Sequence, residues 1–292
     1  MSSHIKDNTS VGRKIGMVLT YIVLIFFAIM AIAPLAWLIM SSFKTSQDYQ
    51  TNRLGLPKTF FWQNYRDSWT RGHFGTYIIN SVIYTSITVI FVLVFGLMSG
   101  FAFAKIRMKC TKILYGSYVI GILMTLQSIM IPLFVMINQV GLYDTKLGVL
   151  IPYIGIGLPM GVYLCTEYIK SVPDALVESA RIDGAKYFRI FGSIIVPMAK
   201  PVATTLAILT ISGTWNEFML INMLTSSTKN KSLPVGIQSF AGALSTDYGK
   251  LFASLVIGLL PMLIFYLVFR KEITKGVAAG AVKGLGITRY VA

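Results

Sequence analysis

The chain has 292 residues, of which 55% are hydrophobic and only 13% are charged. This composition excludes an ordinary soluble domain and predicts an all-α, polytopic membrane protein. The formal net charge of +15 could suggest a nucleic-acid-binding protein, but the 26 Lys and Arg residues are spread between apolar segments instead of gathering in one domain. Their distribution therefore favours a role as orientation signals in a membrane protein.

Six apolar segments are long enough to cross a bilayer as helices. They cover about 15–40, 77–104, 113–138, 147–166, 202–223 and 251–269. Seventeen of the 26 Lys and Arg residues fall in 1–14, 105–112, 168–200 and 270–292, and the tightest cluster is Lys105, Arg107, Lys109 and Lys112. Because basic segments stay inside, we expect a cytoplasmic N-terminus at 1–14, a transmembrane domain at 15–269 with a cytoplasmic loop at 168–200, and a cytoplasmic tail at 270–292.

Two of the predicted spans contain unusual patterns of small residues and proline. Gly96, Gly100 and Ala104 recur every four residues in the second span, which predicts close packing against another helix. The fourth span contains prolines and glycines at 152, 155, 157, 159 and 161. We expect its helix to be bent or interrupted, either as a moving element or as a static kink filled by a neighbouring helix.

A charged helix-turn unit lies between the fourth and fifth spans, at 171–185. Ser171 and Asp174 have the spacing of a capping box, and Gly184 stands where a helix would end in a left-handed turn. An apolar stripe is expected at Leu176, Val177 and Ala180, with Glu178, Arg181 and Asp183 facing water. Such a short amphipathic helix suits insertion into a groove on a partner protein.

The same unit resembles the EAA loop of permease subunits of bacterial ABC importers. The resemblance is carried by Glu178-Ser-Ala-Arg-Ile-Asp-Gly-Ala185 and by Pro197 after an apolar run, and Ser179 stands where alanine is usual. Further segments look like the carbohydrate-uptake branch of these permeases, over most of the chain from about 15 to 284. These segments are Asn64-Tyr65, 74–81, Trp215-Asn-Glu217, Leu233-Pro-Val-Gly236 and the Gly-rich stretch 276–284.

The resemblance implies a mechanism and a set of partners. The loop would sit in a cleft of a cytoplasmic ABC ATPase subunit, of which the complex has two, and it would couple ATP-driven closure to the transmembrane helices. It implies ATPase-coupling roles for Leu176, Glu178, Ser179, Ala180, Arg181, Asp183, Gly184, Ala185 and Pro197. It also implies a second homologous permease that makes a heterodimer, an extracytoplasmic solute-binding protein and a sugar substrate, in the bacterial plasma membrane.

No enzymatic site is expected in this chain. It has no G-x-x-x-x-G-K-[ST] motif, so ATP and Mg are expected on the partner ATPase subunits. His4 and His73 fall outside the spans on opposite predicted sides, and Cys110 and Cys165 lack metal-ligand spacing. We therefore expect neither a cofactor nor a metal, and no nucleic-acid partner.

The candidate substrate path centres on the polar fifth span. Trp215, Asn216 and Glu217 could offer a sugar a stacking face, hydrogen bonds and an acceptor. Packing against a sister subunit and contact with an external binding protein are alternative roles for them. Asn80 and Ser81 open the second span, where they could touch the cargo or cap the helix, and capping is favoured.

Two other functions remain open from the residues alone. A secondary transporter could use Glu217 as a proton or cation site, because an ionisable residue within a span is costly. A membrane scaffold without transport activity is compatible with the composition, but it gives no reason for the polar fifth span.

Overall fold

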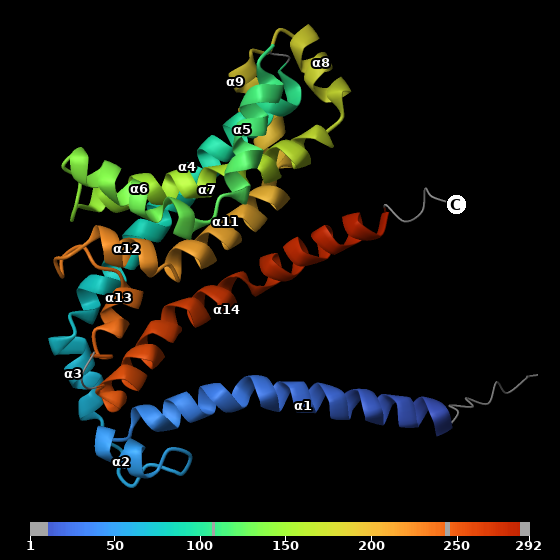
Figure 1. Ribbon diagram of the computed structural model, residues 1–292. Helices are drawn as coiled ribbons and strands as arrows, with labels where there is room; N and C mark the ends of the chain where they lie inside the picture. The colour runs from blue at the N-terminus through green and yellow to red at the C-terminus, as the bar shows by residue number, and fades with distance from the viewer. Residues whose placement is uncertain (1–10, 107–108, 243–245, 287–292) are drawn as a thin grey trace, which may run out of the picture. The chain divides into compact units, whose positions relative to one another are not determined.

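The computed structural model describes residues 11–106, 109–242 and 246–286, and these residues form helices without a β-strand. Figure 1 shows the helices in chain order. They are α1 (Val11–Ser42), α2 (Ser46–Thr51), α3 (Gln63–Arg71), α4 (Phe74–Lys105), α5 (Thr111–Leu123), α6 (Leu126–Gln139), α7 (Lys146–Lys170), α8 (Asp174–Ile182), α9 (Tyr187–Ile190), the π-helical turn η1 (Phe191–Ile195), α10 (Val196–Met198), α11 (Lys200–Trp215), α12 (Met219–Leu224), α13 (Leu233–Gln238) and α14 (Tyr248–Gly286). The all-α prediction is confirmed. Arg107, the first ten residues and the tip of the tail at 287–292 lie outside the described residues.

Four described helices are long and apolar enough to cross a membrane alone, within Gly16–Ser42, Phe74–Lys105, Lys146–Lys170 and Tyr248–Lys271. Two bent pairs pass the same test together. The pair α5 and α6 is bent by 106°, and the segment Tyr187–Met198 is bent by 75° against α11. The described residues thus contain four spans made of single helices, or up to six if each bent pair counts as one. The second bent pair begins at Tyr187, so it does not coincide with the predicted fifth span at 202–223. α11 alone, at 16 residues and about 24 Å, is shorter than a bilayer core of about 30 Å.

The described chain divides into two compact units. One comprises residues up to Ser68 together with Phe240–Ile257, and the other comprises Trp69–Ser239 and the chain from Gly258 onward. In the first unit the segment after α1 folds back onto the start of α14. Trp37 packs edge-on against Phe252 at 5.4 Å between ring centroids, and Ser46 donates a hydrogen bond to Asp247 at 2.9 Å. Gly249 lies so close to the Lys44 carbonyl that a Cβ would approach it to 2.6 Å.

The second unit is organised around the packing of α4 on α7, its most extensive helix contact. The predicted small-residue ridge faces α7: an added Cβ at Gly96 would lie 3.2 Å from the Gly161 backbone, and one at Gly100 would lie 2.7 Å from the Cys165 Cβ. The prediction of close packing is confirmed. Gly157 and Gly161 of α7 in turn lie against Val92 of α4, with distances of 2.8 and 3.1 Å for an added Cβ.

The fourth predicted span is not interrupted, and breaks lie in the third and fifth predicted spans instead. α7 runs unbroken from Lys146 to Lys170 despite Pro152 and Pro159, and two of its glycines, Gly157 and Gly161, serve helix packing. The third predicted span is broken where α5 ends at Leu123 and α6 begins at Leu126. The fifth predicted span ends early, because α11 stops at Trp215 and α12 begins only at Met219.

Candidate functional site

The segment 171–199 forms two short arms at the end of the second unit where α4 ends, and Figure 1 shows α8 and α9 together at that end. α8 begins at Asp174 after Pro173, which holds extended backbone angles. The predicted capping box was wrong. Ser171 is the C-cap of the preceding helix, and its hydroxyl donates to the Tyr168 carbonyl at 2.7 Å instead of accepting from α8. The rigid backbone of proline, not a side-chain cap, starts α8.

The end of α8 agrees with the prediction. Gly184 has a φ of +78°, in the left-handed region that favours glycine. The Gly184 N–H donates to the Arg181 carbonyl at 3.0 Å, and the Ala185 N–H donates to the Ala180 carbonyl at 2.9 Å. This pair of bonds is the Schellman motif, which satisfies the last carbonyls of a helix while reversing the chain. Gly184 therefore sets the angle between the two arms.

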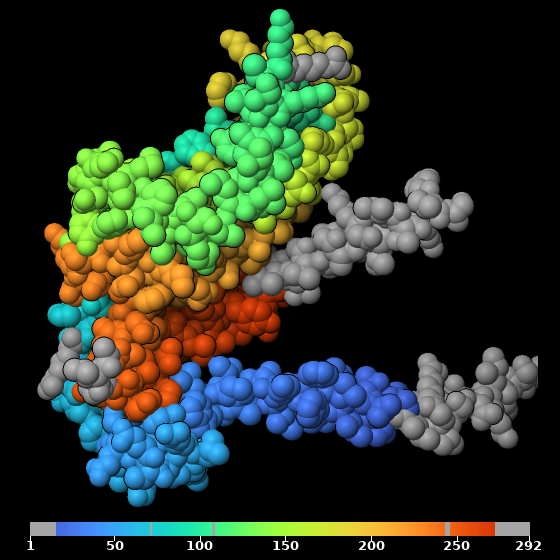
Figure 2. Space-filling view, in the orientation of Figure 1, coloured from blue at the N-terminus to red at the C-terminus, as the bar shows by residue number. Residues whose placement is uncertain are grey.

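The apolar stripe of α8 faces the core of its own chain. Val177 is buried and Ala180 packs against the core cluster of the same chain. The stripe and the exposed charged face thus form at the predicted residues, but Val177 and Ala180 are used within the chain. The side chains that face outward from α8 are 40% exposed at Leu176 and 86% exposed at Ile182. Glu178, Ser179, Arg181 and Asp183 are also exposed. Figure 2 shows the surface of this yellow segment.

The second arm, from α9 to α10, packs under α8 through its own apolar side. Ile190 and Ile195 are fully buried, and the Phe101 ring of α4 lies 5.8 Å from the Phe191 ring. The Arg181 guanidinium lies over the Tyr187 ring at 5.5 Å and connects the two arms by a cation–π contact. Pro197 is exposed within α10 and Ala185 is half-buried between the arms. The segment 171–199 is thus held against α4 and α7 by its buried side chains, and its other side is exposed.

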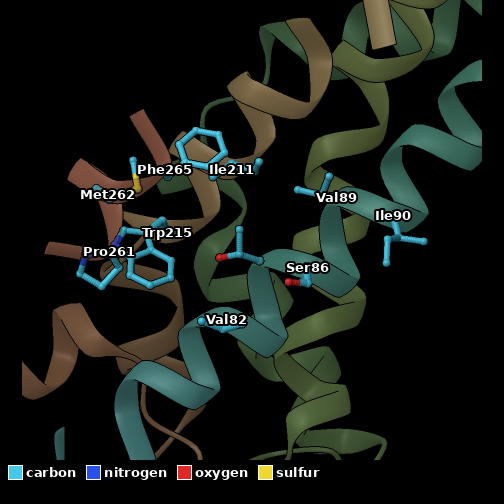
Figure 3. Close-up of a pocket in the computed structure, with 10 residues that line it drawn as sticks. Val82, Ser86, Val89, Ile90, Ile211, Trp215, Pro261, Met262 and Phe265 are labelled. Atoms are coloured by element: carbon cyan, nitrogen blue, oxygen red, sulfur yellow. The ribbon is translucent and has the colours of Figure 1, made fainter. Parts of the chain in front are cut away.

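The residues of the candidate substrate path do not form one site. Trp215 is 8% exposed and lines a cavity of about 400 Å³ between α4, α11 and α14. Figure 3 shows its ring beside Pro261, across from Val82. Glu217 instead lines a different cavity of about 390 Å³ with Tyr153 and Thr88. The indole and the carboxylate, two residues apart, therefore line separate cavities.

Glu217 acts as a structural cap in this arrangement. Its carboxylate accepts hydrogen bonds from the Leu220 N–H at 2.7 Å and the Ile221 N–H at 3.1 Å, which are the first donors of α12. It also accepts the Tyr153 hydroxyl of α7 at 2.7 Å. No pattern in the sequence points to Tyr153, because a tyrosine within an apolar span has no spacing that links it to a carboxylate 64 residues later.

Asn80 and Ser81 lie in the second turn of α4, so the prediction that they cap it was wrong. Asn80 is 2% exposed, and its amide donates to the Lys229 carbonyl at 2.8 Å and the Lys231 carbonyl at 2.9 Å. The Ser81 hydroxyl accepts from the Leu233 N–H at 2.9 Å. Both side chains therefore hold the loop 225–232 against α4, and the Asn80 amide is used by that loop.

The other side of this loop is held by Asp144, which the sequence analysis did not single out. Its Oδ1 accepts from the Ser227 hydroxyl at 2.9 Å and from the Ser226 and Ser227 N–H groups at 3.1 Å. Burial alone raises the pKa of Asp144, but these bonds and one from Asn230 outweigh it and hold the pKa at about 2. The signal that could have revealed Asp144 is its position as the lone acidic residue of the turn between two spans.

Comparison with known proteins identifies the family. Residues 92–271 match the family of binding-protein-dependent transport system inner membrane components. The chain is 34% identical over 275 residues to the multiple sugar-binding transport system permease protein MsmG of Streptococcus mutans, which covers 93% of this chain and 99% of the relative. It is 30% identical over 264 residues to the diacetylchitobiose uptake system permease protein NgcG of Streptomyces coelicolor, covering 90% and 87%.

A solved structure shares the fold. A chain in the crystal structure of a bacterial ABC transporter involved in the import of the acidic polysaccharide alginate superposes with a TM-score of 0.77 at 24% identity, over 90% of this chain and 98% of that chain. With a family match over more than half of the sequence and relatives above 30% identity along most of it, this chain belongs to the inner membrane components of binding-protein-dependent transport systems.

Proposed function

We propose that this chain is the transmembrane permease subunit of an ATP-driven ABC importer for an oligosaccharide or a related sugar. The observation behind the sugar as substrate is that relatives whose names refer to sugar uptake match nearly the whole chain. The described helices supply the membrane-crossing part of such a subunit. The second proposed permease of the complex, a homologue making a heterodimer, would complete the path.

The surface formed by α8 and its left-handed terminator is the proposed docking site for the ATPase. Its exposed apolar groups, Leu176 and Ile182, stand among exposed charged side chains on a helix fixed from below by buried residues. Such a helix enters a groove on a partner as a rigid body. ATP and Mg are proposed to bind to two separate ATPase subunits, so that the chemistry belongs to them and this chain converts their movement into helix rearrangement.

The proposed orientation places both termini and the segment 171–199 in the cytoplasm. The loop 225–232, held by Asn80 and Asp144, then faces the opposite side, where an extracytoplasmic solute-binding protein would deliver the sugar. The excess of Lys and Arg in the predicted cytoplasmic segments supports this arrangement.

Within the path, Asn216 is the exposed member of the predicted trio, and we keep it as a candidate contact for the sugar. Trp215 and Glu217 would border the path from separate cavities. An ion-coupled transporter that uses Glu217 is not favoured by any contact, because the three hydrogen bonds to its carboxylate give it a structural role.

The docking role can be tested with Gly184→Val and a matched control, Gly192→Val. An added Cβ meets nothing within 4 Å at either glycine, but only Gly184 has a positive φ. Valine at Gly184 therefore costs about 1–2 kcal/mol of backbone strain and reorients the arms, whereas valine at Gly192 does not. We expect affinity purification of the unsubstituted chain to recover a P-loop ATPase and a second permease, and Gly184→Val to lose the ATPase or uncouple it from sugar uptake. Normal uptake with Gly184→Val would contradict the docking role.

A further inference from the structure

Lys105, the last residue of α4, has a buried ammonium group. Its side chain is 3% exposed, and Nζ donates hydrogen bonds to the Val172 carbonyl at 2.5 Å and to the Asp174 carboxylate at 2.6 Å. Val172 belongs to the turn between α7 and α8, and Asp174 is the first residue of α8. One side chain of α4 thus holds both the entry and the first turn of the proposed docking helix.

Membrane orientation does not account for this geometry. An orientation signal needs only a positive charge near the membrane surface, as the exposed Lys109 and Lys112 supply. Lysine is rarely buried, because removing an ammonium from water is costly unless it is paired and hydrogen-bonded. The burial of Lys105 is therefore explained by its two acceptors, and losing either would leave the charge only partly compensated.

Besides the cation–π contact of Arg181 with Tyr187, two kinds of contact join α8 to the rest of the chain. The first is apolar, through Val177 and Ala180 against the core cluster that includes Phe101 of α4. Apolar contacts are non-directional, so on their own they specify the register of a helix less sharply than a hydrogen bond does. The second is the Lys105 ammonium, whose short charge-assisted bonds fix the distance and register of α8 relative to α4.

α4 extends from Lys105 to the opposite end of the second unit. It packs closely on α7 at Gly96 and Gly100, and it lines the cavity beside Trp215 through Thr85, Ser86 and Val89. A displacement applied at Lys105 would therefore reach this cavity through one continuous helix of 32 residues.

We propose that Lys105 is a positioning residue that transmits the movement of α8 to α4 when the ATPase acts. The inference rests on the proposed function, since it takes the ATPase as the source of that movement. Lys105 touches neither ATP nor the sugar. It acts through Asp174 and the Val172 carbonyl. Its role is therefore measured as a change in the accessibility of a residue at the cavity end of α4.

The experiment uses the assembled complex in proteoliposomes, with Cys110 and Cys165 replaced by alanine and a reporter cysteine in place of Ser86, which is exposed in the cavity. The rate of maleimide labelling at the reporter is compared with and without ATP plus vanadate, alongside ATP hydrolysis and recovery of the ATPase. Lys105→Met is compared with Lys105→Arg, which keeps the charge and donors, and with Lys112→Met, which removes an exposed lysine of the same cluster. Asp174→Ala is a second variant, which removes the exposed partner of the ion pair and leaves Lys105 in place.

We expect Lys105→Met and Asp174→Ala to reduce the ATP-dependent change in labelling by about tenfold, as for residues that carry coupling between distant sites, while the ATPase still co-purifies and hydrolyses ATP. Lys105→Arg should restore the response and Lys112→Met should leave it intact. An undiminished response in both Lys105→Met and Asp174→Ala overturns the inference. So does a loss of assembly, hydrolysis and response together that arginine fails to rescue, because that result marks a purely structural lysine. Absence of an ATPase from the unsubstituted complex overturns the proposed function itself.

Discussion

The contact between α4 and α7 at Gly100 makes a sharp prediction about stability. An alanine Cβ at this position would lie 2.7 Å from the Cys165 Cβ, 2.9 Å from the Cys165 carbonyl carbon and 3.0 Å from the Thr166 nitrogen. Carbon atoms prefer separations of about 3.5–4.0 Å, so the two helices would have to move apart by about 1 Å. Two of the three obstructing atoms belong to the backbone of α7, which cannot rotate away.

Two opposing effects decide the sign of Gly100→Ala. Alanine favours a helix interior over glycine by about 1 kcal/mol. Overpacking of a close contact costs about 1–3 kcal/mol. We expect a net destabilisation of about 1 kcal/mol, whereas Gly116→Ala in α5, where an added Cβ meets nothing within 4 Å, should be neutral or stabilising.

The assay compares thermal inactivation of the purified complex in detergent, and the rate at which a maleimide reaches Cys165 in a background with Cys110 replaced by serine. Cys165 is fully buried at this contact, so separation of the helices should speed its labelling in Gly100→Ala and leave it unchanged in Gly116→Ala. If both variants inactivate at the same temperature and label Cys165 equally slowly, α4 and α7 do not pack as described.

Two further predictions concern orientation and pH. Because Cys110 is exposed next to the basic cluster that we propose to be cytoplasmic, a membrane-impermeant maleimide should label it in inverted vesicles and not in intact cells, and the reverse pattern would contradict the orientation. The native pKa of Asp144, about 2, lies below its ordinary value of 3.8, so its contribution to stability is present above pH 4 and lost as the pH falls toward 2. Thermal inactivation of Asp144→Asn should therefore differ from that of the unsubstituted complex at pH 7 and approach it near pH 2; a difference that is the same at both values would refute the linkage.

Local patterns predicted the parts of the site that depend on backbone geometry. Gly184 was recognisable because a left-handed turn at the end of a helix favours glycine. The ridge of Gly96 and Gly100 was recognisable because close helix packing needs small residues. The roles of Lys105, Asp144 and Tyr153 depend on partners 64 to 86 residues away. Nothing in a local pattern specifies such a partner, so these residues became visible only when the helices were placed together.

The unbroken course of α7 shows why counting prolines misplaced the break. A proline within a helix frees the carbonyl four residues earlier and crowds it with its ring. In α7 the residues four positions before Pro152 and Pro159 are Gly148 and Gly155. Because glycine has the widest backbone freedom, we infer that its peptide can tilt away from the ring, so that the helix accommodates each proline without a break. The break between α5 and α6 needs no proline at all, because Thr125 takes extended backbone angles and starts a new helix. Helix breaks in this family member therefore follow from where a residue leaves helical angles, and a proline preceded by such a glycine is weak evidence for one.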